Sequence, residues 1–276
     1  MKNQVLRRNI ILLIILLTLS ACDNQVEAPG RTPVEGWAVL AEKDDYSDVG
    51  MTDMLVDHID IVRMREALIK QGWDPDQIHD LKEFTREDLQ TELDWLEEKA
   101  DSNDIVFLYV SSHGEYLRLV IEWNDFIADE WDDINSDKRI LLIDSCRAAR
   151  FTKPVRKDPE PHFSIASVDM DEFGWKGLED EGLPIIGLVF TYYFVEALED
   201  PAADEDGDGL VSVLEAVNQA EAKQRYYMHN VVFAVPEFLE GYHNLGVQPE
   251  NDLTFPDVIV DDKIGEPLYL RIAPDQ

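Results

Sequence analysis

Two nearly continuous apolar segments constrain the fold of this chain more than any other feature. They are residues 104–110 (DIVFLYV) and residues 139–144 (RILLID). Each has the length of a strand and lacks the polar alternation of a strand with one wet face, so both are predicted to be buried on both faces. Helical stretches separate the predicted strands. This alternation indicates an α/β domain with a mostly parallel central sheet and helices on both faces.

Weaker patterns place the neighbouring elements. Residues 37–41 (WAVLA) and 163–168 (FSIASV) are predicted to be short strands. Residues 60–72 repeat apolar side chains at helical spacing and end in a glycine, which predicts an amphipathic helix. Residues 85–100 repeat the pattern, and Thr85 with the acid three residues later forms a helix-capping signal.

Side chains that can take part in nucleophilic catalysis follow the two most clearly predicted strands. Ser111-Ser112-His113-Gly114 comes after the first, and Ser145-Cys146 comes after the second. Since neighbouring parallel strands end at the same edge of a sheet, we expect the imidazole and the thiol to meet there, as nucleophilic catalysis requires. The backbone amides of Gly114 and Cys146 could then form an oxyanion hole. The alternative is that Cys146 is a small buried hydrophobic residue.

These residues carry a resemblance to a known family. DIVFLYVSSHGEY followed by RILLIDSCRA resembles the caspase-type cysteine peptidases, a clan that includes metacaspases and legumains. The resemblance extends from about residue 37 to about residue 242. It implies the caspase-hemoglobinase-like three-layer sandwich and a cysteine endopeptidase that forms a thioester acyl-enzyme. It also implies that Cys146 is the nucleophile, His113 the general base and acid, and Gly114 an oxyanion donor.

The resemblance extends to a substrate pocket. Ser111 and Asp144 match positions that line the first specificity pocket in metacaspases, and an acidic pocket would favour Arg or Lys before the cut bond. Alternatively, Asp144 only accepts backbone hydrogen bonds at the end of its strand. The chain also departs from the family. Ser112 replaces the usual glycine, Arg-Ala follows the cysteine, and the 33 residues from His113 to Cys146 are fewer than the roughly 50 of caspases proper.

The beginning of the chain is predicted to be an export signal. Residues 1–21 have three cations followed by an apolar run, and the last residues before Cys22 resemble the bacterial lipobox, so Cys22 is the expected lipidation site. Residues 22–36 are polar and contain prolines and glycines, which predicts a flexible tether to a peptidase domain over residues 37–276. The expected location is therefore a bacterial membrane, at its periplasmic or extracellular face, with the lipid as the anchor.

The charge of the chain limits its partners. The formal net charge is -34, and removing the three cations of residues 1–21 makes it -37. Such a negative chain is not expected to bind nucleic acid, and it favours a basic protein or peptide substrate.

A second motif predicts calcium binding. Residues 204–215 (DEDGDGLVSVLE) match all positions of an EF-hand loop between two helical stretches, so we expect a structural or regulatory Ca²⁺. The alternative is an acidic turn that binds no metal. The expected ligands are Asp204, Asp206, Asp208, the carbonyl of Leu210, Ser212 and both carboxylate oxygens of Glu215.

One basic segment stands out in this acidic chain. Residues 147–157 hold five cations directly after the expected nucleophile, where caspase-like peptidases commonly have a maturation cut. We expect self-cleavage there, unless the segment is an ordinary solvated loop. The alternative for the whole chain is a catalytically silent, calcium-binding lipoprotein that uses the same fold for protein contacts.

Overall fold

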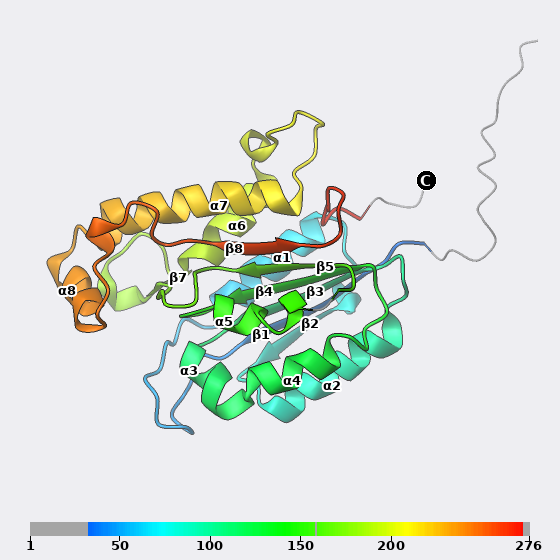
Figure 1. Ribbon diagram of the computed structural model, residues 1–276, viewed down its shortest axis with the longest axis horizontal. Coiled ribbons are helices and arrows are strands. Elements are labelled where there is room, and N and C mark those ends of the chain that lie inside the picture. The colour runs from blue at the N-terminus through cyan, green and yellow to red at the C-terminus, as the bar shows by residue number, and fades with distance from the viewer. Residues whose placement is uncertain (1–32, 158, 273–276) are drawn as a thin grey trace, which may run out of the picture. The chain divides into compact units, whose positions relative to one another are not determined.

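The computed structural model describes residues 33–157 and 159–272 (Figure 1). The predicted export signal over residues 1–21, the lipidation site at Cys22 and most of the predicted tether lie outside the described residues. Regular structure begins at Gly36, one residue before the predicted domain boundary.

A six-stranded sheet forms the centre of the domain. Its order is β2-β1-β3-β4-β5-β8, and every neighbouring pair is parallel except β5 and β8. The predicted mostly parallel α/β sheet is therefore confirmed. The strands are β1 (Gly36–Glu42), β2 (Ile78–Lys82), β3 (Ile105–Ser111), β4 (Lys138–Asp144), β5 (His162–Ala166) and β8 (Ile259–Asp262).

Helices cover both faces of the sheet, which gives the predicted three layers (Figure 1). Alternate residues of β1, β3 and β4 point to opposite faces, and each face is apolar because the strands are apolar throughout. One face packs against α1 (Ile59–Lys70), α6 (Val189–Glu199) and α7 (Val213–Tyr227). The other packs against α2 (Arg86–Lys99), α4 (Trp123–Glu130) and α5 (Ala149–Thr152).

The two helices expected from periodicity are present as α1 and α2. Thr85 caps α2, and its side chain and that of Asp88 exchange hydrogen bonds with each other's backbone amides. Three shorter elements complete the site region described below. They are α3 (Gly114–Tyr116) and the two strands of a small separate ribbon, β6 (Lys176–Gly177) and β7 (Gly187–Leu188), while α8 (Pro236–Asn244) lies further along the chain.

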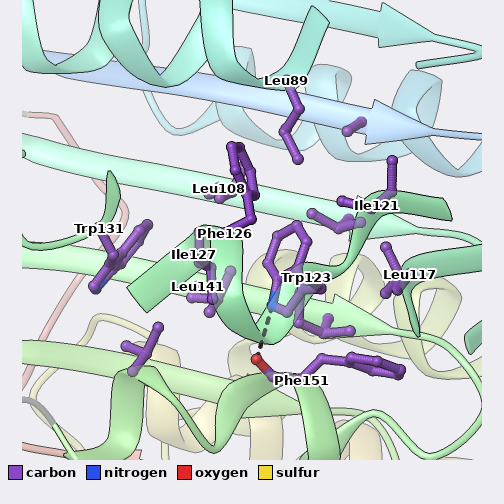
Figure 2. Packing of buried hydrophobic residues seen from close by; sticks show 14 of the residues in the cluster. Leu89, Leu108, Leu117, Ile121, Trp123, Phe126, Ile127, Trp131, Leu141 and Phe151 are labelled. Atoms are coloured by element: carbon purple, nitrogen blue, oxygen red, sulfur yellow. Dashed lines mark hydrogen bonds between the residues drawn. The ribbon is translucent and has the colours of Figure 1, made fainter. Parts of the chain in front are cut away.

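The basic segment after Cys146 is folded and is not a flexible loop. It forms α5 and a 3₁₀ turn at Val155–Lys157, because the apolar side chains of Phe151 and Val155 among its cations are buried against the core. Figure 2 shows Trp123 of α4 donating its indole N–H to the carbonyl of Phe151, at 2.9 Å. Burying a phenylalanine side chain contributes about 1.5–3 kcal/mol, so this segment is firmly held.

The C-terminal tail, for which the sequence suggests no role, belongs to the same core. It supplies β8, which pairs antiparallel with β5, and the carbonyl of Leu270 accepts a hydrogen bond from the Trp73 indole at 2.6 Å. In the part of the chain that the structure describes, no helix combines the length and the apolar character needed to cross a bilayer.

Candidate active site

The loops that follow β3 and β4 meet at the carboxyl edge of the sheet. Ser111 and Asp144 are partners in the parallel register, so both strands end at the same level. A Cβ atom added to Gly114 would lie 2.2 Å from the carbonyl oxygen of Cys146, closer than real Cβ contacts come. The structure therefore brings the His113 and Cys146 loops into direct contact, and only glycine fits at position 114.

His113 is held by two contacts that the sequence did not indicate. Its Nε2 atom lies 2.9 Å from the carbonyl oxygen of Thr52, and its backbone amide donates to the Tyr46 hydroxyl at 2.7 Å. A carbonyl oxygen only accepts, so Nε2 carries the proton and Nδ1 keeps its lone pair. The Tyr46 ring also packs against the imidazole, with 4.6 Å between centroids. This is the tautomer that a base acting through Nδ1 needs.

The thiol of Cys146 is neutral in this state. Cys146 is half-buried, and burial raises its pKa to about 11, opposed by a hydrogen bond from the Gly174 amide and by the charge of Arg147. Within residues 33–157 and 159–272, no hydrogen bond joins this thiol to the His113 imidazole. The two groups therefore share an edge of the sheet without a direct hydrogen bond between them.

The backbone directly after Cys146 is held in a strained conformation. Arg147 adopts a left-handed conformation, with φ of 59°, and its amide donates to the carbonyl of Glu172 at 2.8 Å. Its guanidinium bonds Glu115 at 3.0 Å and lies over the Phe173 ring. A non-glycine residue in this region costs roughly 1 kcal/mol or more, so these contacts hold a strained turn at the nucleophile position.

Ser111 and Asp144 lie beside the thiol but are closed to solvent. Asp144 is 2% exposed, and its carboxylate accepts hydrogen bonds from the Thr191 amide at 3.1 Å and the Thr191 hydroxyl at 2.8 Å. Burial raises the pKa of Asp144 to about 6, because the charged form loses hydration. The hydroxyl of Ser111 is buried and has no hydrogen-bond partner among the residues that the structure describes. These contacts support the alternative that Asp144 only accepts hydrogen bonds at the end of its strand, since its carboxylate joins β4 to the first turn of α6.

A buried cluster of ion pairs, which the sequence did not indicate, lies at the end of the neighbouring strand β1. Glu42 is the register partner of Ser111 on the other side, so Glu42, Ser111 and Asp144 end three adjacent strands on one face. The Lys176 ammonium lies 2.6 Å from Glu42, 2.5 Å from Asp44 and 3.4 Å from Asp60. Glu42, an acid at the end of an apolar strand, could have indicated a buried ion pair. Its partner Lys176 lies 134 residues further along the chain, so no local sequence pattern connects the two residues.

The predicted calcium loop is partly assembled. The carboxylates of Asp204, Asp206 and Asp208 lie within 4.8 Å of one another, an arrangement that oxygen-seeking cations use. Glu215 is engaged elsewhere, because one oxygen accepts from the amides of Glu205 and Asp206 and the other accepts from Ser212. The structure therefore groups three of the six predicted ligands, while Ser212 and Glu215 form a capping box at the start of α7.

Comparison with known proteins identifies the family and the fold. The family model described as the caspase domain matches residues 35–233. Caspase-1 from Spodoptera frugiperda has a similar structure, with a TM-score of 0.53 and 11% sequence identity over 86% of this chain and 90% of that chain. At this identity the likeness shows the fold alone. A search of curated proteins found no significant sequence match.

Proposed function

Because this chain belongs to the caspase-domain family, we propose that it is a cysteine endopeptidase with Cys146 as nucleophile and His113 as general base and acid. The contact between the His113 and Cys146 loops at Gly114 is the observation that supports this most strongly. An imidazole with a free Nδ1 and a thiol at one sheet edge are the groups that acyl transfer needs.

The proposed reaction begins from the neutral pair. His113 Nδ1 takes the proton from the Cys146 thiol, and the sulfur attacks the carbonyl carbon of the peptide bond. The resulting oxyanion accepts hydrogen bonds from the amides of Gly114 and Cys146. The C–N bond then breaks, with the proton on His113 passing to the leaving amine. Water, deprotonated by the same imidazole, hydrolyses the thioester and regenerates the thiol.

The Thr52 carbonyl has an orienting role in this account. Its contact with Nε2, at 2.9 Å, fixes the imidazole and leaves Nδ1 free to act as the base. When His113 is doubly protonated, the negative end of the carbonyl dipole stabilises the positive charge. A third group that orients the base is the usual companion of a nucleophile and base pair.

The proposed substrates are proteins or peptides cut after Arg or Lys. The buried carboxylates of Glu42 and Asp144 end two strands at this edge of the sheet, Asp44 and Asp60 lie in the same cluster as Glu42, and the chain carries a formal charge of -34. Both features favour a basic side chain. Since these carboxylates are at most 2% exposed, a substrate side chain reaches them only after a local rearrangement.

Self-processing would fall at the exposed end of the basic segment. Arg147 and Arg150 are tied by ion pairs to Glu115 and Asp171, whereas Lys157 is exposed and ends its turn. A peptidase binds an extended backbone, so Lys157 fits better than the helical residues before it.

Membrane attachment and calcium complete the proposal. Lipidation at Cys22 would place the domain on a bacterial membrane at its periplasmic or extracellular face. Calcium at Asp204, Asp206 and Asp208 is supported by the convergence of their carboxylates, and its role would be structural or regulatory. Binding would require Glu215 to exchange its present backbone hydrogen bonds for the ion.

The competing proposal is a catalytically silent calcium-binding lipoprotein that acts through protein contacts. The raised pKa of Cys146 and the missing hydrogen bond between thiol and imidazole favour it. Turnover separates the two proposals. Purified residues 23–276 should cleave an Arg- or Lys-terminated peptide reporter, and Cys146→Ala and His113→Ala should each abolish cleavage. Equal turnover by the wild type and Cys146→Ala would reject the peptidase assignment.

A further inference from the structure

Lys176 lies in a buried site with more negative than positive groups. Its ammonium contacts the carboxylates of Glu42, Asp44 and Asp60, each at most 1% exposed, and its own side chain is 3% exposed. Burial raises the pKa of Glu42 to about 8, with Asp60 adding to the rise and Lys176 opposing it. Three carboxyl groups therefore surround one lysine.

Two further basic side chains lie at the cluster. Arg63 lies 3.6 Å from Asp60 and donates to the Ile186 carbonyl, and His58 lies 3.8 Å from Asp44. Among the described residues, neither of these side chains pairs with Glu42.

Backbone amides hold the three carboxylates in place as well. The Ile61 amide donates to Glu42 and the Val56 amide to Asp44. The Leu188 amide donates to Asp60, so the carboxylates do not depend on Lys176 alone for their positions. Three carboxylates converging on one ammonium resemble a binding site for a cation.

The cluster is continuous with the candidate active site. Glu42 is the register partner of Ser111, which is the partner of Asp144, two residues before the thiol. Lys176 itself follows Gly174, whose amide bonds the Cys146 sulfur, by two residues. The segment that carries Lys176 into the cluster is thus the segment that lies against the nucleophile.

The Lys176 ammonium contacts all three carboxylates, and all four side chains of the cluster are buried. A second ammonium or guanidinium could enter only by displacing the first. Exchange would cost little electrostatically, since one cation replaces another among the same carboxylates.

Resting on the proposed peptidase function, we propose that Lys176 is the specificity-determining residue of this site, whose ammonium holds the position that the Lys or Arg side chain before the cut bond takes. Substrate binding then requires the Lys176 side chain to withdraw. Truncating it should leave an open acidic pocket whose preferred occupant is a basic side chain.

The first test compares matched substrates. Lys176→Ala should raise kcat/KM at least tenfold for a Lys-terminated reporter and much less for its uncharged norleucine analogue. Lys70→Ala removes a surface lysine paired with Glu199 and should change neither value. A Lys-to-norleucine ratio that stays equal to the wild-type ratio, or falls, would overturn the proposal.

The second test needs no activity. The melting temperature of Lys176→Ala should rise saturably with n-butylammonium, which has the length of a whole lysine side chain, while tetramethylammonium, which has no N–H donor, should have no such effect. Wild type should not respond. If Lys176→Ala does not fold, the double variant Lys176→Ala with Glu42→Gln has one fewer carboxylate and serves for both tests.

The two tests separate this inference from the peptidase assignment. Stabilisation by n-butylammonium without turnover of any reporter would reject the peptidase and retain an exchangeable cation site. Turnover without stabilisation in either variant would retain the peptidase and show that Lys176 is a fixed structural counter-ion.

Discussion

A single methyl group at Gly114 should separate activity from folding. The Cβ of Gly114→Ala would lie 2.2 Å from the Cys146 carbonyl oxygen, whereas real Cβ contacts do not come closer than 3.0 Å, so the two loops must part by at least about 0.8 Å. Displacing a reacting group by about 1 Å can lower a rate about 100-fold. We therefore expect kcat/KM to fall about 100-fold, which corresponds to about 2.7 kcal/mol of transition-state stabilisation.

The cost to stability should be smaller and measurable separately. Overpacking typically destabilises by about 1–3 kcal/mol, and in a domain of this size 1 kcal/mol shifts the melting temperature by about 2–4 °C. Gly241→Ala is the matched control, because its Cβ meets nothing within 4 Å and it lies inside α8. That variant should be stabilised by about 0.5–1 kcal/mol and keep wild-type kcat/KM.

The assay is reporter hydrolysis beside thermal unfolding on all three proteins. A folded Gly114→Ala chain with wild-type kcat/KM would refute the reasoning, since it would show that contact between the two loops does not position the reacting groups. Equal losses in Gly114→Ala and Gly241→Ala would also refute it.

Three further predictions concern the thiol, the base and the metal loop. Iodoacetamide should label Cys146, the one cysteine of residues 23–276, at a rate that rises about tenfold per pH unit from pH 7.5 to 10, because its raised pKa keeps the thiolate scarce; a plateau near pH 7 would show a preformed ion pair. Tyr46→Phe removes both the acceptor of the His113 amide and the donor to the buried Lys43 carbonyl, so it should cost about 1–3 kcal/mol by chemical denaturation together with part of the activity. Tyr226→Phe, at an exposed position, should have no effect. Millimolar calcium should raise the melting temperature, and Asp206→Asn with Asp208→Asn should remove that response; no shift in the wild type would mean that the loop is only a turn.

The fold was predictable because its central strands are apolar throughout. The segments that became β3 and β4 have no polar face to place in water, and a sheet buried on both sides is the structure that satisfies them. The helices α1 and α2 carry complete local signals, including the Thr85 cap. By contrast, β8 is a short acidic strand at an edge, and only its pairing with β5 identifies it.

The candidate site was predictable only where its residues follow strands directly. His113 and Cys146 lie within two residues of strand ends, so the parallel register alone brings them to one edge. Thr52 acts through a backbone carbonyl that any residue type would supply. Lys176 is separated from Glu42 by 134 residues in the sequence, so no local pattern indicates their contact. The charge of the basic segment after Cys146 suggested a solvated loop. The buried side chains of Phe151 and Val155 instead fold it against the core.

Covalent capture of the nucleophile tests the central claim most directly. Residues 23–276 would be incubated at pH 7.5 with a lysyl acyloxymethyl ketone peptide and examined by intact mass spectrometry and peptide mapping. The account predicts one adduct per chain, mapped to Cys146, and a labelling rate at least tenfold lower in His113→Ala. An unmodified chain whose thiol still reacts with iodoacetamide at high pH, or equal labelling with and without His113, would contradict it.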